Sequence, residues 1–167
     1  MIRFSHPTPV GWSPDGQHLA FLRQSRTEGS TALIVADADG SHERVLAVRR
    51  SPDRYLNLSH VGAPNVRPAW SPDGRVIALI GSDDASLQAL FVDVATGSER
   101  VVALSALGSI TGPAWVDAGA LVVTRTVEHG LLQQLWHLSY PGGQLTRLTN
   151  DLSSFLGPAS QRMVAAW

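Results

Sequence analysis

The chain of 167 residues contains no cysteine, and its thirteen basic residues are all arginine. The lack of cysteine excludes disulfides, thiolate metal sites and cysteine nucleophiles, and it fits a reducing or an oxidising compartment. The lack of lysine excludes a Schiff-base amine, a phosphate-loop ammonium and an ammonium general base. Several enzyme classes are therefore excluded before any motif is considered.

Long apolar runs are also missing. Residues 1–7 lack the apolar core of a signal peptide, and no stretch approaches the roughly 18 apolar residues of a membrane span. As written, the sequence fits a cytoplasmic protein, and a periplasmic location would need a signal upstream. A net charge of −1 gives no general attraction for nucleic acid or anionic membranes. We expect no nucleic-acid partner and no membrane insertion.

Motifs for catalysis are absent as well. The sequence has no G-x-S-x-G elbow, HExxH pair, phosphate loop or dinucleotide fingerprint. We therefore expect the chain to have no catalytic residue, no cofactor and no metal site, and we expect that it is not an enzyme. Asp83 and Asp84 could hold a hard cation, but adjacent aspartates in a Gly-Ser-Asp-Asp segment more often form a turn, which we favour.

One phrase, a tryptophan followed by a turn sequence, occurs three times, and a weaker fourth copy begins at Gly157. The interval from Trp70 to Trp115 is 45 residues, and Ser160 takes the tryptophan position 45 residues later. This period is typical of a four-stranded propeller blade. The repeat signature comprises Trp12, Ser13, Pro14, Asp15, Gly16, Trp70, Ser71, Pro72, Asp73, Gly74, Trp115 and Gly119.

The segments between these landmarks predict strands buried to different degrees. Ser-Pro-Asp-Gly predicts a hairpin, and later turns at Gly40, Gly97 and Gly143 predict a second hairpin in each unit. The second and third strands are continuous apolar runs, which indicates burial on both faces, whereas the fourth is mixed. A β-sandwich, the alternative fold, would show alternation instead.

We therefore predict an all-β fold, a partial β-propeller of about three complete four-stranded blades plus the start of a fourth. The chain forms one segment, 1–167, with units at about 6–50, 64–105, 109–150 and 154–167. Since propellers close with about four to eight blades, we expect a longer parent protein or self-association that completes the ring.

The aromatic-Ser-Pro-Asp-Gly phrase with its later Asp-Gly or Thr-Gly turn resembles the TolB-type, WD40-like propeller repeat. The copies at Trp12 and Trp70 match fully, while Val116 and Ala118 depart from the pattern in the third. Similar repeats occur in TolB, in the propellers of S9-type peptidases, and in arrays attached to bacterial serine/threonine kinases or transcriptional regulators. The resemblance implies a fold and leaves the function open.

The first interval is longer than 45 residues, and the extra residues fall between Gly40 and Trp70. We expect an insertion loop, 48–63, on the face that carries the variable connections of a propeller, where binding sites concentrate. Arginines and an aromatic suit a partner-binding loop, although a merely solvated loop is the alternative. The candidate residues are Arg49, Arg50, Asp53, Arg54, Tyr55 and His60.

Three functions remain open at this point. The first is a non-catalytic protein-interaction or scaffold module, which needs a protein partner. The second is an accessory or sensor domain of a kinase, transcriptional regulator or peptidase whose active site lies outside this chain. The third is a degenerate gene product, which the weakened fourth repeat suggests.

Overall fold

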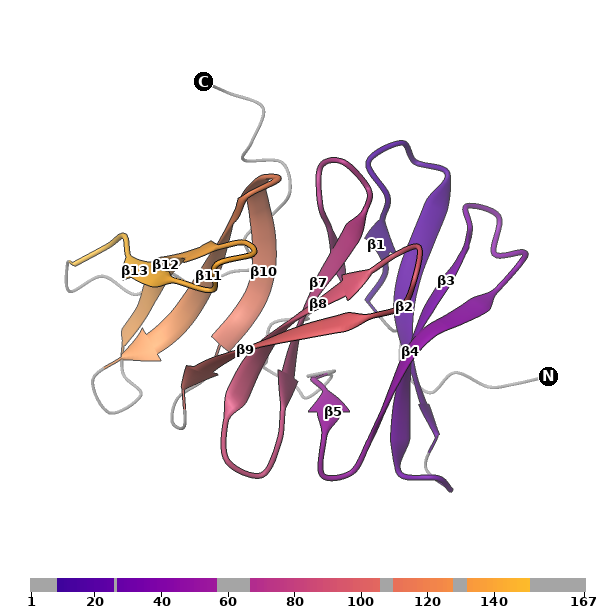
Figure 1. Cartoon of the computed structure of the whole chain (residues 1–167), viewed down its shortest axis with the longest axis horizontal. Coiled ribbons are helices and arrows are strands. Elements are labelled where there is room, and N and C mark those ends of the chain that lie inside the picture. Colours follow the sequence, from indigo (N-terminus) through magenta and orange to yellow (C-terminus); the bar gives the residue numbers. More distant parts are fainter. Residues whose placement is uncertain (1–8, 26, 57–66, 106–109, 128–131, 151–167) are drawn as a thin grey trace.

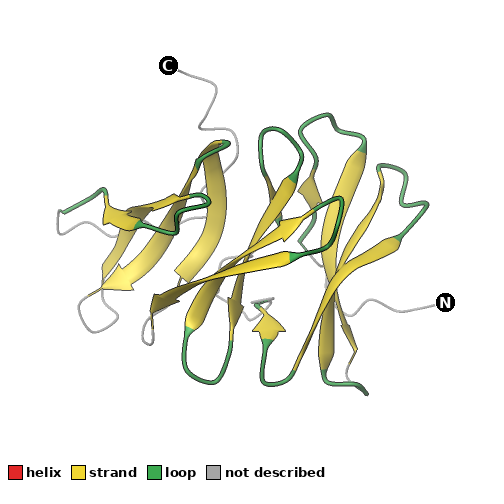
Figure 2. Cartoon of the chain, in the orientation of Figure 1, coloured by secondary structure: helices red, strands yellow, loops and turns green. Residues whose placement is uncertain are grey.

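A computed structural model describes residues 9–25, 27–56, 67–105, 110–127 and 132–150. Every regular element in these ranges is a β-strand, and the coloured parts of the chain in Figure 2 consist of strands and loops. Within the described ranges no helix could cross a membrane. The all-β class expected from the sequence is confirmed.

The described strands form three antiparallel sheets that stand side by side (Figure 1). Blade 1 contains β1 (Gly11–Trp12), β2 (His18–Ser25), β3 (Ser30–Asp37) and β4 (Arg44–Arg50). Blade 2 contains β5 (Arg54–Tyr55), β6 (Ala69–Trp70), β7 (Val76–Ser82), β8 (Leu87–Asp93) and β9 (Glu99–Ser105). Blade 3 contains β10 (Ile110–Asp117), β11 (Ala120–Val127), β12 (Leu132–Ser139) and β13 (Leu145–Arg147).

Each blade is a meander that runs in chain order from an inner to an outer strand. The inner strands touch in succession, β1 against β6 and β6 against β10. Successive sheets that meet along their first strands are the arrangement of propeller blades. The described strands therefore do not form the two facing layers of a sandwich.

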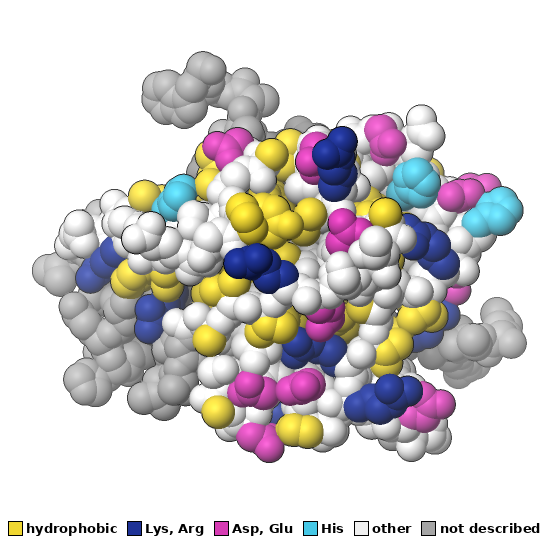
Figure 3. Space-filling model, in the orientation of Figure 1, with side chains coloured by type: hydrophobic (Ala, Val, Ile, Leu, Met, Phe, Trp, Pro, Cys, Tyr) yellow, Lys and Arg dark blue, Asp and Glu magenta, His cyan; other side chains and the backbone are white. Residues whose placement is uncertain are grey.

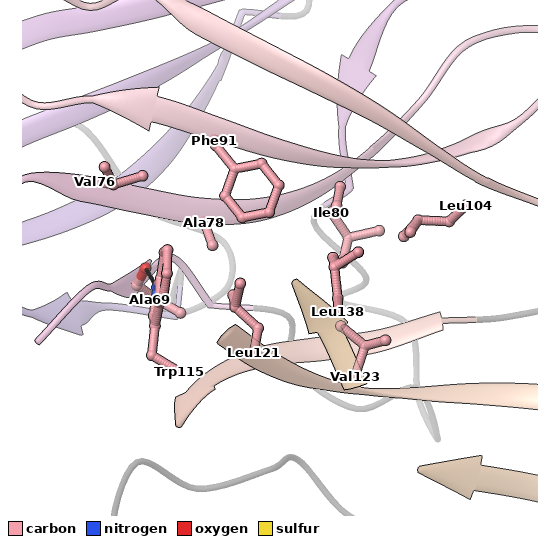
Figure 4. Close-up of a cluster of buried hydrophobic side chains, with 11 residues drawn as sticks. Ala69, Val76, Ala78, Ile80, Phe91, Leu104, Trp115, Leu121, Val123 and Leu138 are labelled. Carbon is pink, nitrogen blue, oxygen red and sulfur yellow. Dashed lines mark hydrogen bonds between the residues drawn. The ribbon is translucent and has the colours of Figure 1, made fainter. Parts of the chain in front are cut away.

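Apolar cores fill the spaces between blades. Figure 4 shows Ala78, Ile80 and Phe91 of blade 2 pointing toward Trp115 and Leu121 of blade 3. The core between blades 1 and 2 includes Ala20, Leu22, Leu33, Val35, Trp70, Ile77, Leu79 and Leu90. Strands β7 and β8 send alternate side chains to the two cores, which explains why their sequences are apolar without a break. Each fully buried leucine or isoleucine contributes roughly 2 kcal/mol.

The tryptophans of the repeat join each blade to the one before it. The indole Nε1–H of Trp70 donates to the carbonyl of Gly11 at 3.1 Å, and that of Trp115 donates to the carbonyl of Ala69 at 2.9 Å. Both indoles are 3% exposed. These two indoles therefore pack between blades and have a structural role.

The Ser-Pro-Asp-Gly segments form the predicted hairpins. In the second copy the Ser71 hydroxyl accepts from the N–H of Val76 at 2.9 Å, and the N–H of Gly74 donates to the carbonyl of Ser71 at 2.9 Å. Gly74 has φ 71°, a left-handed conformation that glycine adopts without strain. Gly16 repeats this geometry with φ 70°. The turn residues therefore have a conformational role in both copies.

The inner strand of blade 2 is split between two segments. Tyr55 pairs with Gly81, and Trp70 pairs with Ile77, so β5 and β6 both lie along β7. In blade 3 the single strand β10 fills both positions along β11. Gly81 allows the approach of β5, because a Cβ there would lie 2.8 Å from the carbonyl oxygen of Arg54.

This arrangement differs from the insertion loop expected at 48–63. Residues 48–50 continue β4, and residues 54–55 form β5. The expectation was wrong at these positions because strand pairing with distant residues gives them order. Residues 57–63 of that loop, and the fourth unit expected at 154–167, lie outside the described residues.

Candidate functional site

The candidate partner-binding residues divide into exposed and buried groups. Arg50, Asp53 and Arg54 are exposed around the turn that joins β4 to β5. Arg49 is 8% exposed and Tyr55 is 2% exposed. His60 lies outside the described residues. The structure therefore brings five of the six residues together, but it does not present all five to solvent.

Arg49 and Tyr55 were expected in a surface loop, and the structure corrects this expectation. Arg49 lies on the outer strand of blade 1, and its guanidinium is 5.8 Å from the ring centre of Tyr55. Its Nε donates to Glu99 at 3.1 Å, and its Nη1 donates to Gln88 at 3.0 Å. Both acceptors belong to blade 2. Arg49 therefore contributes to the contact between blades. The repeat pattern of the sequence does not predict this role.

Glu99 is the centre of this contact. Its carboxylate accepts from Arg49 and also from the hydroxyl of Tyr55. Burial and the hydrogen bond to Glu99 raise the pKa of Tyr55 well above its ordinary value, so the phenol remains a neutral donor. Gln88 extends the network, because its amide donates to Asp83 at 2.5 Å. We call Arg49, Tyr55, Gln88 and Glu99 the interblade network.

The turn between β4 and β5 is held on one side by the loop between β2 and β3 and on the other by the end of strand β7. The N–H of Ser51 donates to the carbonyl of Gly29 at 3.1 Å, and Nε of Arg54 donates to the Ser82 hydroxyl at 3.2 Å. Acidic and basic side chains mingle at the lower edge in Figure 3, where Figure 1 places β5. The exposed charges of this turn therefore project from an anchored backbone.

Asp83 forms a turn, as favoured from the sequence. Its Oδ1 accepts from the backbone N–H of Ala85 at 2.8 Å and from that of Ser86 at 2.7 Å. These hydrogen bonds lower the pKa of Asp83 below its ordinary value. Among the described residues, no three His, Asp or Glu side chains gather as a metal site requires.

A cleft of about 550 Å³ opens on the opposite face, between the hairpins of blades 1 and 2. Its walls include Asp15, His18, Asp37, His42 and Asp73. Histidine and acidic side chains gather over blade 1 at the upper right of Figure 3. No local pattern in the sequence predicts this grouping, because its members come from different hairpins.

The polar cluster in this cleft lacks the geometry of a catalytic relay. Nδ1 of His42 lies 2.8 Å from Asp37 and 3.0 Å from the Ser41 hydroxyl. A serine triad needs the acid on one ring nitrogen and the serine on the other. Here both partners meet the same nitrogen. His18 lies farther from Asp37, at 3.8 Å.

The aspartates of the Ser-Pro-Asp-Gly turns are also explained by local structure. The Ser71 hydroxyl donates to Asp73 at 2.6 Å, and the N–H of Arg75 donates to the same oxygen at 3.1 Å. These donors, the serine first, lower the pKa of Asp73 below its ordinary value of 3.8. The pKa of Asp15 is lowered in the same way. Both carboxylates complete turns.

Trp12 breaks the pattern of the repeat tryptophans. It is 49% exposed, whereas its two counterparts are 3% exposed. The difference arises because, among the described residues, no blade precedes blade 1.

These features define a class, the β-propeller, because three consecutive four-stranded blades stack through their apolar faces. Comparison with known proteins narrows the class. No protein-family model matches the chain. An 86-residue stretch is 30% identical to the Tol-Pal system protein TolB of Xylella fastidiosa strain M12, and it covers 50% of this chain and 17% of that protein.

Solved structures extend the likeness to nearly the whole chain. TolB from Acinetobacter baumannii matches with a TM-score of 0.64 and 18% identity, over 87% of this chain and 33% of that one. Putative TolB from Agrobacterium tumefaciens matches with a TM-score of 0.65 and 21% identity, over 87% and 47%. The propeller domain of the Trilobed protease from Pyrococcus furiosus matches with a TM-score of 0.58 and 14% identity, over 86% and 43%.

The chain therefore has a β-propeller fold like those of TolB and of the propeller domain of the Trilobed protease, and half of its length is similar in sequence to TolB. It spans less than half the length of each of these relatives.

Proposed function

We propose that the chain is a non-catalytic protein-interaction module, a stiff arc of blades that presents the turn 50–54 to a protein partner. The observation that supports this proposal is the anchoring of that turn. Arg49 on one side and Tyr55 on the other are fixed by Glu99, while Arg50 and Asp53 remain exposed. A surface that is already ordered loses less conformational entropy when it binds.

The chemistry of the turn favours a partner with charges of both signs. Arg50 and Arg54 offer forked donors for carboxylates, and Asp53 offers an acceptor close by. Such mixed charge contributes to orientation and selectivity more than to affinity. We therefore expect a polar protein surface to bind here.

The test compares two triple-alanine variants in capture from cells of the source organism, with quantitative mass spectrometry. The first removes Arg50, Asp53 and Arg54. The matched control removes two arginines and one aspartate elsewhere, at the exposed positions Asp39, Arg75 and Arg100. We expect a protein that is captured by the wild type and by the control variant but not by the first variant. Equal capture by all three would refute the role of this turn.

The alternative function is an accessory or sensor domain of a kinase, transcriptional regulator or peptidase whose active site lies outside this chain. The propeller of the Trilobed protease, which shares the fold, supports it. Genomic sequence on both sides of this segment separates the two. A kinase, regulator or hydrolase domain in frame supports the alternative, and further propeller repeats alone support the interaction module.

A further inference from the structure

Strand β4 is the outer edge of blade 1, and it leads directly into the turn 50–54 (Figure 1). Among the described strands it pairs with β3 alone. The other edge of such a strand carries backbone N–H and C=O groups that can pair with a further strand. The free edge of β4 therefore adjoins the exposed charges of the turn.

The backbone of β4 directs the polar groups of two residues away from the sheet. The N–H of Ser51 donates to the carbonyl of Gly29 at 3.1 Å, one position beyond the pair of Ser30 with Arg50. Residues of an antiparallel ladder alternate between facing the partner strand and facing away from it. The N–H and C=O of Arg50 therefore face away from β3, as do those of Val48, and none of these groups has a hydrogen bond among the described residues.

The side chains on one face of β4 are apolar and exposed. Val45 is 60% exposed and Val48 is 42% exposed. They pair with Ile34 and Ala32, which lie two positions apart on β3, so both valines share a face. This exposure is a property of outer strands, because Val101 at the equivalent position of blade 2 is 46% exposed although blade 1 lies on that side.

Charge distinguishes β4 from the outer strand of blade 2. Its seven residues include three arginines and no acidic residue, whereas β9 has one glutamate and one arginine. Arg49 bonds Glu99, and Arg44 donates to the carbonyl of Val94 at 2.7 Å. Arg50 is exposed, and its guanidinium has no hydrogen bond or ion pair with a described residue. A strand that pairs with this edge therefore gains most if it brings a carboxylate.

The same charge argues against a second copy of β4 as the added strand. In the symmetrical antiparallel pairing of two copies, Arg44 would lie opposite Arg50, and like charges directly opposite one another destabilise a sheet. An acidic strand would place a carboxylate there instead. The edge thus discourages its own copies and favours a strand of opposite charge.

We propose that an extended, acidic segment of a protein partner adds to β4 as a fifth strand of blade 1. The backbone of the segment pairs with Val48 and Arg50, and its carboxylate pairs with the guanidinium of Arg50. Apolar side chains at alternate positions of the segment cover Val45 and Val48. This inference rests on the proposed function, because it states how the partner of the turn 50–54 is held.

A fluorescein-labelled peptide, Ser-Glu-Thr-Val-Thr-Val-Ser with both ends capped, tests the charge and the apolar contact by fluorescence anisotropy. Its glutamate and valines alternate, so they share one face of a strand. We expect saturable binding to the 167-residue chain that weakens at least about tenfold in Arg50→Glu. Lysine in place of the glutamate should restore binding to this variant. Arg100→Glu is the matched control, because Arg100 is exposed on the outer strand of blade 2.

Methylation of the peptide nitrogens tests the backbone pairing. One peptide carries methyl groups on its glutamate and valines, and the other carries them on its threonines. Only one of these sets faces β4 in a strand, so one peptide should lose binding and the other should keep it. Equal affinity of the two methylated peptides would overturn strand addition. Failure of the wild-type chain to bind the unmethylated peptide would also overturn it.

Capture with Val45→Asp and Val48→Asp separates this proposal from the proposed function, because both variants leave the turn 50–54 unchanged. Circular dichroism confirms that they are folded, and each should lose the protein that the wild type captures. If they keep a protein that the triple variant of the turn loses, the turn binds its partner without β4, and strand addition is wrong. If no captured protein depends on the turn but the peptide binds as expected, the role of the turn fails and β4 remains a peptide-binding edge.

Discussion

Replacing Glu99 with glutamine should weaken the contact between blades 1 and 2, because it removes the charge of the side chain without changing its shape. The carboxylate accepts from Arg49 of blade 1 and from Tyr55, which fills the inner position of blade 2. Arg49 is 8% exposed, and the side chain of Glu99 is 21% exposed. The glutamine removes the negative charge that faces the buried guanidinium of Arg49, and it keeps one acceptor oxygen where Glu99 offers two, one to Arg49 and one to Tyr55.

The expected loss is about 3 kcal/mol, because removal of one partner leaves a buried charge uncompensated. The chain contains a matched pair for comparison. Arg23 bonds Glu43 at 2.9 and 3.0 Å, but their side chains are 44% and 42% exposed. Exposed pairs contribute less than about 1 kcal/mol. The Arg49–Glu99 and Arg23–Glu43 pairs thus consist of the same residue types and differ mainly in their exposure to water.

Two double-mutant cycles in urea measure this difference. The first combines Arg49→Met with Glu99→Gln, and the second combines Arg23→Met with Glu43→Gln. Added salt should weaken the second coupling more than the first, because ions screen exposed charges better. If the two coupling energies are equal, the argument that burial strengthens the interblade network is wrong.

Three further predictions concern the turns and the packing between blades. The pKa of Asp73 is lower in the folded state than its unfolded-state value of 3.8. Its ionised carboxylate therefore adds to the free energy of unfolding above pH 3.8, and this contribution is lost as the pH falls through the folded-state pKa. Urea titrations from about pH 5 to 3 should show a smaller fall in the free energy of unfolding for Asp73→Asn than for the wild type. Gly11→Ala should cost about 2–3 kcal/mol in urea unfolding, because its Cβ would collide with the carbonyl of Pro68, whereas Gly16→Ala meets no atom and should cost only about 1 kcal/mol for its left-handed φ. Trp115→Phe should lose about 2–3 kcal/mol from one hydrogen bond and part of a buried ring, and a loss equal to that of an exposed substitution would contradict the role assigned to the indole.

The fold could be predicted from sequence because its signals are local and repeated. Proline, aspartate and glycine specify the hairpin at Gly16 and Gly74 within four residues, and the apolar runs of β7 and β8 report burial on both faces. Repetition at a constant interval then gives the stacking of blades. None of these inferences needs a contact between residues that are distant in sequence.

The candidate site could be predicted only in part, because its contacts are distant. Arg49 and Glu99 are fifty positions apart, and no local pattern announces their pairing. Likewise, the pairing of Tyr55 with Gly81 turns part of an expected loop into a strand. The exposure of Trp12 depends on whether a blade stands before it, which a sequence repeat does not encode.

The split inner strand of blade 2 has a consequence for protein engineering. Leu56 and Ala69 each keep their own bond or pairing with β7, so residues 57–68 join two points that are fixed independently of each other. A peptide exchanged for those residues would leave these two attachments to β7 in place. The molecule thus provides a grafting position in the innermost strand of a propeller, where foreign sequence would ordinarily break the sheet.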